Sequence, residues 1–170
     1  MDNIQLTEPT LRYLEPPLLL RNDQGRFSNV SSQSGSIFTT PIAARGAAFG
    51  DLDNDGQVDV AINCNDGPAI ILHNRGGNGN HWLILNLTGT ASNRDAIGSK
   101  IRLVSDSGQQ QTRYVSTAGS YISASDKRVH FGLGSSKKIR LIEITWPSGI
   151  VQRLESVSAD QILQVKEPSR

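Results

Sequence analysis

Cysteine is almost absent from this chain of 170 residues: Cys64 stands alone, so neither an internal disulfide nor a zinc site of several cysteines can form. Long hydrophobic runs are missing too. Leu18–Leu20 and Ala69–Leu72 are far shorter than the ~20 apolar residues of a membrane-spanning helix, so no membrane span is expected. Residues 1–4 lack both the basic and the apolar part of a signal peptide. No charge of one sign is in excess, since 17 basic residues face 16 acidic ones, and no nucleic-acid partner is expected.

Short apolar segments dominate what is present. Hydrophobic residues (36%) and 16 glycines give the composition of an ordinary globular protein. The segments are rich in β-branched or aromatic residues and bounded by turn residues, and apolar and polar residues alternate most clearly in 81–87 and 141–146. One marginal helix is predicted over 7–15, with Thr7 as its N-cap. The chain is otherwise predicted to be all-β, with strands over 17–21, 26–30, 46–50, 58–63, 68–73, 81–88, 97–104, 111–118, 129–133, 139–146, 150–154 and 161–166.

The clearest break in the chain is residues 74–80, where three glycines and three asparagines occur in seven positions. We therefore predict two units, residues 1–79 and residues 80–170. Charge is distributed unevenly between them: residues 1–80 hold nine acidic and five basic side chains, and the remainder hold seven and twelve. This asymmetry favours two units that attract each other, although solvated surfaces often show as much.

One acidic loop carries specific chemistry. Residues 51–59 place aspartates at loop positions 1, 3, 5 and 9, with Gly56 at the bend. At an effective dielectric near 20, each pair of carboxylates ~4 Å apart costs on the order of 4 kcal/mol, which a bound cation offsets. Ca²⁺ takes 6–8 oxygen ligands in such loops. The predicted calcium ligands are Asp51, Asp53, Asp55, Asp59 and the backbone carbonyl of Gln57.

This loop is not an EF-hand. An EF-hand requires a bidentate glutamate at position 12, where this chain has Ile62, and its flanking segments are helical, whereas 47–50 and 58–62 are predicted to be extended. We therefore expect a calcium loop inside a β-hairpin. Two alternatives remain: an acidic turn without an ion, and Mg²⁺, which is less favoured because it keeps its own waters.

The loop and its flanks resemble a known repeat. Gly46–Asp59 resembles an FG-GAP repeat of the VCBS type, the blade unit of integrin-like β-propellers, and Leu18–Phe27 and Ile70–Asn74 resemble parts of the same repeat. The resemblance implies that the same five residues hold calcium. The Gly-Ala-Pro element of the repeat stands here as Gly67–Ala69 in the order Gly-Pro-Ala, which alters the turn and leaves the loop unchanged.

The second half, from Asn80 onward, resembles the ASPIC/UnbV domain that follows such repeats in the cartilage acidic protein family. The matching stretches are 92–98, 119–121, 130–134 and 146–149. The resemblance implies an antiparallel β-sandwich-like domain packed against the partial propeller blade, and it transfers no catalytic residue. A single blade leaves a sheet edge uncovered. We therefore expect residues 1–80 to dock on the second unit or on a second chain, which would make a homo-oligomer.

The leading functional hypothesis is a non-enzymatic, calcium-binding β module for adhesion or binding, whose ligand is an unidentified protein or glycan. Extracellular calcium is millimolar and would fill even a site with a Kd of ~10⁻⁴ M, so the expected location is extracellular or periplasmic.

Two alternatives are open. A carbohydrate-binding or accessory domain of a larger secreted enzyme would use exposed aromatic side chains, whereas Trp82, Tyr114, Tyr121 and Trp146 are predicted to pack in the core. A hydrolase using Ser123, Asp126 and His130 is disfavoured because the chain has no Gly-x-Ser-x-Gly motif, and His130 is predicted to be a hydrogen-bonded structural histidine.

Overall fold

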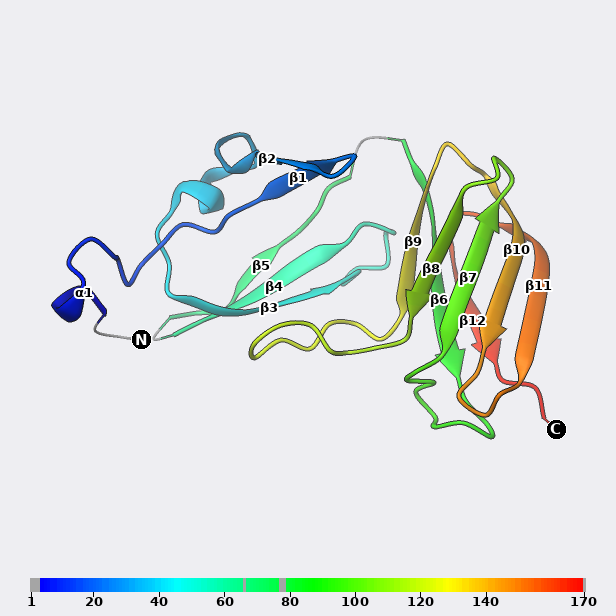
Figure 1. Ribbon diagram of the computed structural model, residues 1–170. Coiled ribbons are helices and arrows are strands. Elements are labelled where there is room, and N and C mark those ends of the chain that lie inside the picture. The colour runs from blue at the N-terminus through cyan, green and yellow to red at the C-terminus, as the bar shows by residue number, and fades with distance from the viewer. Residues whose placement is uncertain (1–3, 66, 77–78, 170) are drawn as a thin grey trace.

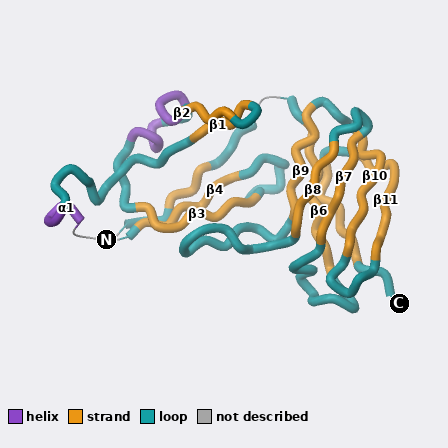
Figure 2. Tube along the Cα trace, in the orientation of Figure 1, coloured by secondary structure: helices purple, strands orange, loops and turns teal. Residues whose placement is uncertain are grey.

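The computed structural model describes residues 4–65, 67–76 and 79–169 (Figure 1). The all-β prediction is confirmed: strands alternate with loops along nearly the whole described chain (Figure 2). Each predicted strand overlaps one observed strand; 81–88 and 161–166 agree at both ends, and the others have shifted ends. The strands are β1 (Leu20–Asp23), β2 (Arg26–Asn29), β3 (Ala44–Gly50), β4 (Asp59–Cys64), β5 (Ile70–Leu72), β6 (His81–Thr88), β7 (Lys100–Ser105), β8 (Gln110–Tyr114), β9 (Val129–Gly134), β10 (Lys138–Thr145), β11 (Val151–Ser158) and β12 (Gln161–Lys166).

Helical structure is confined to short segments. The helix predicted over 7–15 is wrong: α1 spans Ile4–Thr7, and 3₁₀ turns occupy Ser31–Gln33 and Ser36–Thr39. Pro9 disfavours helical geometry at the preceding residue, and the segment is mostly exposed, so no core packing compensates. No helix among the described residues is long and apolar enough to cross a membrane.

The N-terminal part contains two small sheets. β1 and β2 form a hairpin whose turn, Gln24 and Gly25, has positive φ at both residues, as two-residue hairpin turns require. β3, β4 and β5 form an antiparallel three-stranded sheet, with Ala48 opposite Ala61 and Ala61 opposite Ile71. The described residues form no closed propeller.

The C-terminal part packs two sheets around one apolar core. The four-stranded sheet has the order β11-β10-β7-β8 and the three-stranded sheet has the order β12-β6-β9. One feature of the predicted antiparallel sandwich is wrong, because β12 pairs with β6 in parallel. After β11 the chain crosses to the other sheet and runs beside β6 in the same direction. The largest fully buried side chains of the core are Leu83, Leu85, Ile101, Leu103, Phe131, Leu133, Ile139, Ile142, Ile144 and Trp146.

A long connection joins the two parts. Residues 115–128, between β8 and β9, leave the sandwich and run along β3; we call them the docking loop (Figure 1). The hydroxyl of Ser123 accepts a hydrogen bond from Ala47 N at 2.9 Å, and the Ser125 hydroxyl accepts one from Phe49 N at 3.2 Å. The expected docking of residues 1–80 on the second unit is therefore confirmed by direct contacts. The predicted unit boundary follows residues 77 and 78, which lie outside the described residues.

Candidate metal centre

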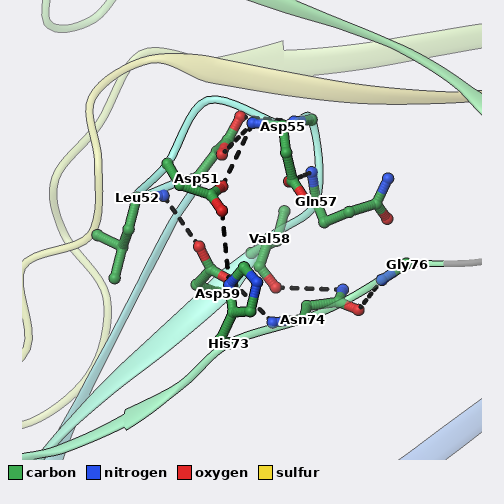
Figure 3. Close-up of polar contacts among 11 residues, drawn as sticks. Asp51, Leu52, Asp55, Gln57, Val58, Asp59, His73, Asn74 and Gly76 are labelled. Atoms are coloured by element: carbon green, nitrogen blue, oxygen red, sulfur yellow. Dashed lines mark hydrogen bonds and ion pairs between the residues drawn. The ribbon is translucent and has the colours of Figure 1, made fainter.

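The acidic loop connects β3 to β4 as a hairpin (Figure 3). Two of its residues adopt the left-handed conformation, Asn54 with φ of 64° and Gly56 with φ of 86°. Gly56 is required for a second reason, since a Cβ there would lie 1.9 Å from the Trp82 ring. The tight loop folds its aspartates back on their own backbone, as their spacing predicted.

Asp51, at the first position of the loop, is buried, with 3% of its surface exposed. Its Oδ1 accepts a hydrogen bond from Asp55 N at 3.1 Å, and its Oδ2 accepts one from Gly56 N at 2.9 Å. Asp55 in turn accepts one from Gln57 N at 2.7 Å. These backbone donors fix the loop in a single shape.

Asp59 lies at the start of β4 and is 1% exposed. It accepts hydrogen bonds from Asn74 N at 2.8 Å and Leu52 N at 3.0 Å. The bond from Asn74 lowers the pKa of the Asp59 carboxyl most, burial opposes this, and the bond from Leu52 and the neighbouring His73 lower the pKa further. The carboxyl is therefore held ionised at neutral pH.

The carboxylates gather into two overlapping groups. Ligand atoms of Asp51, Asp53 and Asp59 all lie within 4.8 Å of one another. Asp53 also belongs to a second group of the same spread, with Asp55 and His73. The structure thus brings the four predicted aspartates to one place but divides them between two groups, and the role of the Gln57 carbonyl stays a prediction.

His73 is a member of this site that the sequence did not predict. Its Nδ1 lies 3.3 Å from Asp59 Oδ1 and 3.7 Å from Asp53 Oδ2. The signal was indirect: β5 pairs antiparallel with β4, and the pairing of Leu72 with Val60 brings His73, the residue after β5, to the start of β4. Asn74 reaches the loop in the same way.

These residues fit a hard divalent cation. Carboxylate oxygens are the ligands that such ions prefer, and each carboxylate has about four lone-pair positions, so the backbone hydrogen bonds leave acceptor capacity unused. Among the described residues, His73 lies within ion-pair distance of Asp53 and Asp59. Asp51, Asp53 and Asp59 would hold the ion, which would offset their mutual repulsion.

The side chains weighed for other functions have separate places. Ser123 bonds to Ala47, Asp126 pairs with Arg128 at 2.6 Å, and His130 contacts the Gly56 carbonyl oxygen at 2.8 Å, so each side chain of the considered hydrolase triad has a different partner. The structural role predicted for His130 is confirmed.

The aromatic side chains divide in two. Trp146 is buried, as predicted, and Trp82 is half-buried against the acidic loop. The prediction of core packing is wrong for Tyr114 and Tyr121, which are 60% and 70% exposed. Tyr114 ends strand β8 at a sheet edge and Tyr121 lies in the docking loop, so both rings lie outside the apolar core.

Comparison with known proteins identifies the second half. Residues 89–170 match the family model described as ASPIC and UnbV, which confirms this part of the resemblance, although the match begins after β6. Cartilage acidic protein 1 of Xenopus tropicalis is 28% identical over 107 residues, which cover 61% of this chain. The match spans only 16% of that relative's length. The FG-GAP resemblance of the first half stays a prediction.

Proposed function

We propose that this chain is a calcium-binding, non-enzymatic β module that presents a fixed surface to a protein or glycan outside the cell or in the periplasm. The observation that carries the proposal is the convergence of Asp51, Asp53 and Asp59 within 4.8 Å, two of them almost fully buried. Gathering several carboxylates in a partly buried site is costly unless a cation offsets their combined charge.

Calcium is the cation that this loop favours. Its large, irregular oxygen shell tolerates ligands from a strained hairpin loop, whereas Mg²⁺ demands near-ideal octahedral geometry and retains waters. The FG-GAP resemblance of residues 46–59 supports the same ion. When bound, calcium would neutralise the aspartates and join the β3–β4 hairpin to the end of β5.

The N-terminal part would be a partial propeller blade. All residues of the β1–β2 hairpin are exposed, including Phe27, and Ile71 of β5 is exposed too. Such exposure is expected of a repeat whose apolar face is covered by further units. Additional repeats or a second copy in a homo-oligomer would supply that cover. The extracellular setting is supported by the calcium loop and by similarity to a protein named for cartilage.

Calorimetric melting in calcium and in EGTA tests the proposal. A calcium concentration a hundred times Kd stabilises the folded state by about 2.7 kcal/mol, or about 5–10 °C for a chain of this size. Asp53→Ala should abolish the shift with little other effect, because this side chain is half exposed. Asp106→Ala removes an equal charge from an exposed turn and should keep the shift. A melting temperature of the unaltered chain that is the same in both buffers would refute calcium binding.

A carbohydrate-binding role is the second candidate, and the exposure of Tyr114 and Tyr121 favours it. A glycan array would detect binding, and Tyr121→Ala or Tyr114→Ala should reduce it. Thr112→Ala, on the same strand as Tyr114, is the matched control. Binding that survives both tyrosine substitutions would count against this role.

A further inference from the structure

The acidic loop is held from two sides. Its carboxylates gather on the side of the candidate cation, while its backbone is contacted by the C-terminal part. Arg128 Nη2 donates to the Asp51 carbonyl oxygen at 2.5 Å, and Arg128 Nη1 donates to Asn54 Oδ1 at 2.6 Å. His130 Nε2 lies 2.8 Å from the Gly56 carbonyl oxygen, so this nitrogen carries the proton.

The contact is shaped for close approach. A Cβ on Gly46 would lie 2.2 Å from the Ile122 carbonyl oxygen of the docking loop, and a Cβ on Gly50 would lie 2.9 Å from Asp126 Cβ. The Trp82 ring occupies the equivalent space at Gly56. Three glycines of one hairpin thus leave room for the docking loop and for β6, which indicates a specific interface.

Arg128 is itself held in place. Its Nε donates to Asp126 Oδ2 at 2.6 Å, and its backbone N donates to Asp126 Oδ1 at 2.9 Å. The planar guanidinium then presents its two remaining nitrogens to Asp51, the first proposed calcium ligand, and to Asn54, which has positive φ. Arg128 is the last residue of the docking loop. The same residue therefore belongs to the interface between the two parts and contacts the acidic loop.

We propose that Arg128 is a positioning residue for the acidic loop. Through Arg128, cation binding and docking of the N-terminal part on the C-terminal part are reciprocally coupled. The proposal rests on calcium binding by the loop. An ion that fixes Asp51 and Asp53 also fixes the backbone oxygen of Asp51 and the side chain of Asn54, which Arg128 contacts. Cation binding therefore orders the acidic loop for Arg128, and the contacts of Arg128 order the same loop for the cation. Linkage requires both effects to have equal size.

The positive charge of Arg128, taken alone, predicts that replacing the residue tightens calcium binding, whereas the proposed positioning role predicts weaker binding. This difference makes the proposal testable. A positive charge beside the site repels calcium, so its removal would tighten binding if Coulomb repulsion dominated. Loss of positioning instead weakens binding. Arg128→Lys keeps the charge and loses the two-pronged contact, whereas Arg128→Gln loses both.

Isothermal titration of the full chain with calcium chloride is the direct test. We expect Arg128→Gln and Arg128→Lys each to raise the calcium Kd by about five- to tenfold, within the usual range of coupling between sites. Asn54→Gly, which keeps positive φ available, should weaken binding in the same direction by removing one acceptor. Arg113→Gln removes an exposed positive charge from β8 and should leave Kd unchanged.

Hydrogen exchange supplies the reciprocal measurement. Calcium should slow amide exchange in residues 118–126 of the unaltered chain, and this protection should shrink in the Arg128→Lys variant. Circular dichroism identifies variants that fail to fold, and Arg128→Lys remains informative if Arg128→Gln is one of them. Unchanged or tighter calcium binding by a folded Arg128→Lys variant overturns the coupling while leaving calcium binding intact. Absence of binding by the unaltered chain overturns both.

Discussion

Two buried carboxylate centres of this molecule differ in how their charge is balanced. Glu167, just after β12, is 2% exposed and stands alone. Its Oε2 accepts hydrogen bonds from the backbone N of Thr90, Ala91 and Ser92 at 2.7–2.9 Å, and its Oε1 accepts from the hydroxyls of Ser92 and Ser148 at 2.8 and 2.5 Å. Five donors serve one carboxylate.

In the acidic loop, fewer donors serve each carboxylate. Asp51 and Asp59 each accept two backbone hydrogen bonds, and Asp53 adds a third carboxylate within 4.8 Å. Donors fix the orientation of these groups without dispersing their combined charge. The comparison teaches that a carboxylate saturated with donors needs no ion, whereas a cluster with fewer donors for each carboxylate is where we propose that a cation binds.

The largest expected effect is that of Glu167→Ala. The substitution leaves donors from two loops, 90–92 and 148, without their shared acceptor, and buried unpaired donors are costly. We expect the melting temperature to fall further than for any other substitution named here, while the calcium-dependent shift persists. Glu155→Gln, on the exposed face of β11, is the control. Loss of the calcium shift in the Glu167 variant would contradict the independence of the two centres.

Asp59→Ala should lower the stability by an intermediate amount and, unlike Glu167→Ala, should also remove the response to calcium. It removes the acceptor of Leu52 N and Asn74 N, which should cost about 1–3 kcal/mol in EGTA, and it should also abolish the stabilisation by calcium. Urea unfolding in both buffers measures the two terms separately. A variant that is destabilised but still responds to calcium would show that Asp59 serves the hairpin and not the ion.

The smallest effect is a dependence on acid pH. Burial alone would raise the pKa of Glu167 above its usual 4.5, but hydrogen bonds from Ser148, Ser92 and Thr90 lower it to about 2. A lowered folded-state pKa gives a stabilisation that is complete above pH 4.5 and is lost as the pH falls toward 2. Melting in EGTA across this interval should therefore show a steeper decline for the unaltered chain than for Glu167→Gln. Parallel declines would argue against an ionised Glu167.

Much of the fold and part of the site could be predicted from local patterns. Short runs of β-branched or aromatic residues bounded by turn residues predicted the strands, and alternation added support in 81–87 and 141–146. The spacing of Asp51, Asp53 and Asp59 predicted their convergence, because a tight loop with glycine at its bend leaves few other arrangements. The motifs of the second half predicted the match of residues 89–170 to the ASPIC and UnbV family model.

The roles of other residues could not be predicted from their neighbours in the sequence. His73 joins the site through the pairing of β5 with β4, and Arg128 joins it through a loop 77 positions away from Asp51 in the chain. Glu167 is one acidic residue near the C-terminus until the sheets bring loops 90–92 and 148 around it. The parallel pairing of β12 with β6 likewise depends on the route between two sheets.

The sequence by itself determined which segments are extended and where negative charge is concentrated, since both are properties of near neighbours along the chain. Only the tertiary structure decided which carboxylates are balanced by donors and which remain as a cluster, since the donors of Glu167 and the contacts of Arg128 come from residues distant in sequence. Local periodicity sets the face that a side chain occupies, and the packing of sheets and loops sets what it meets there.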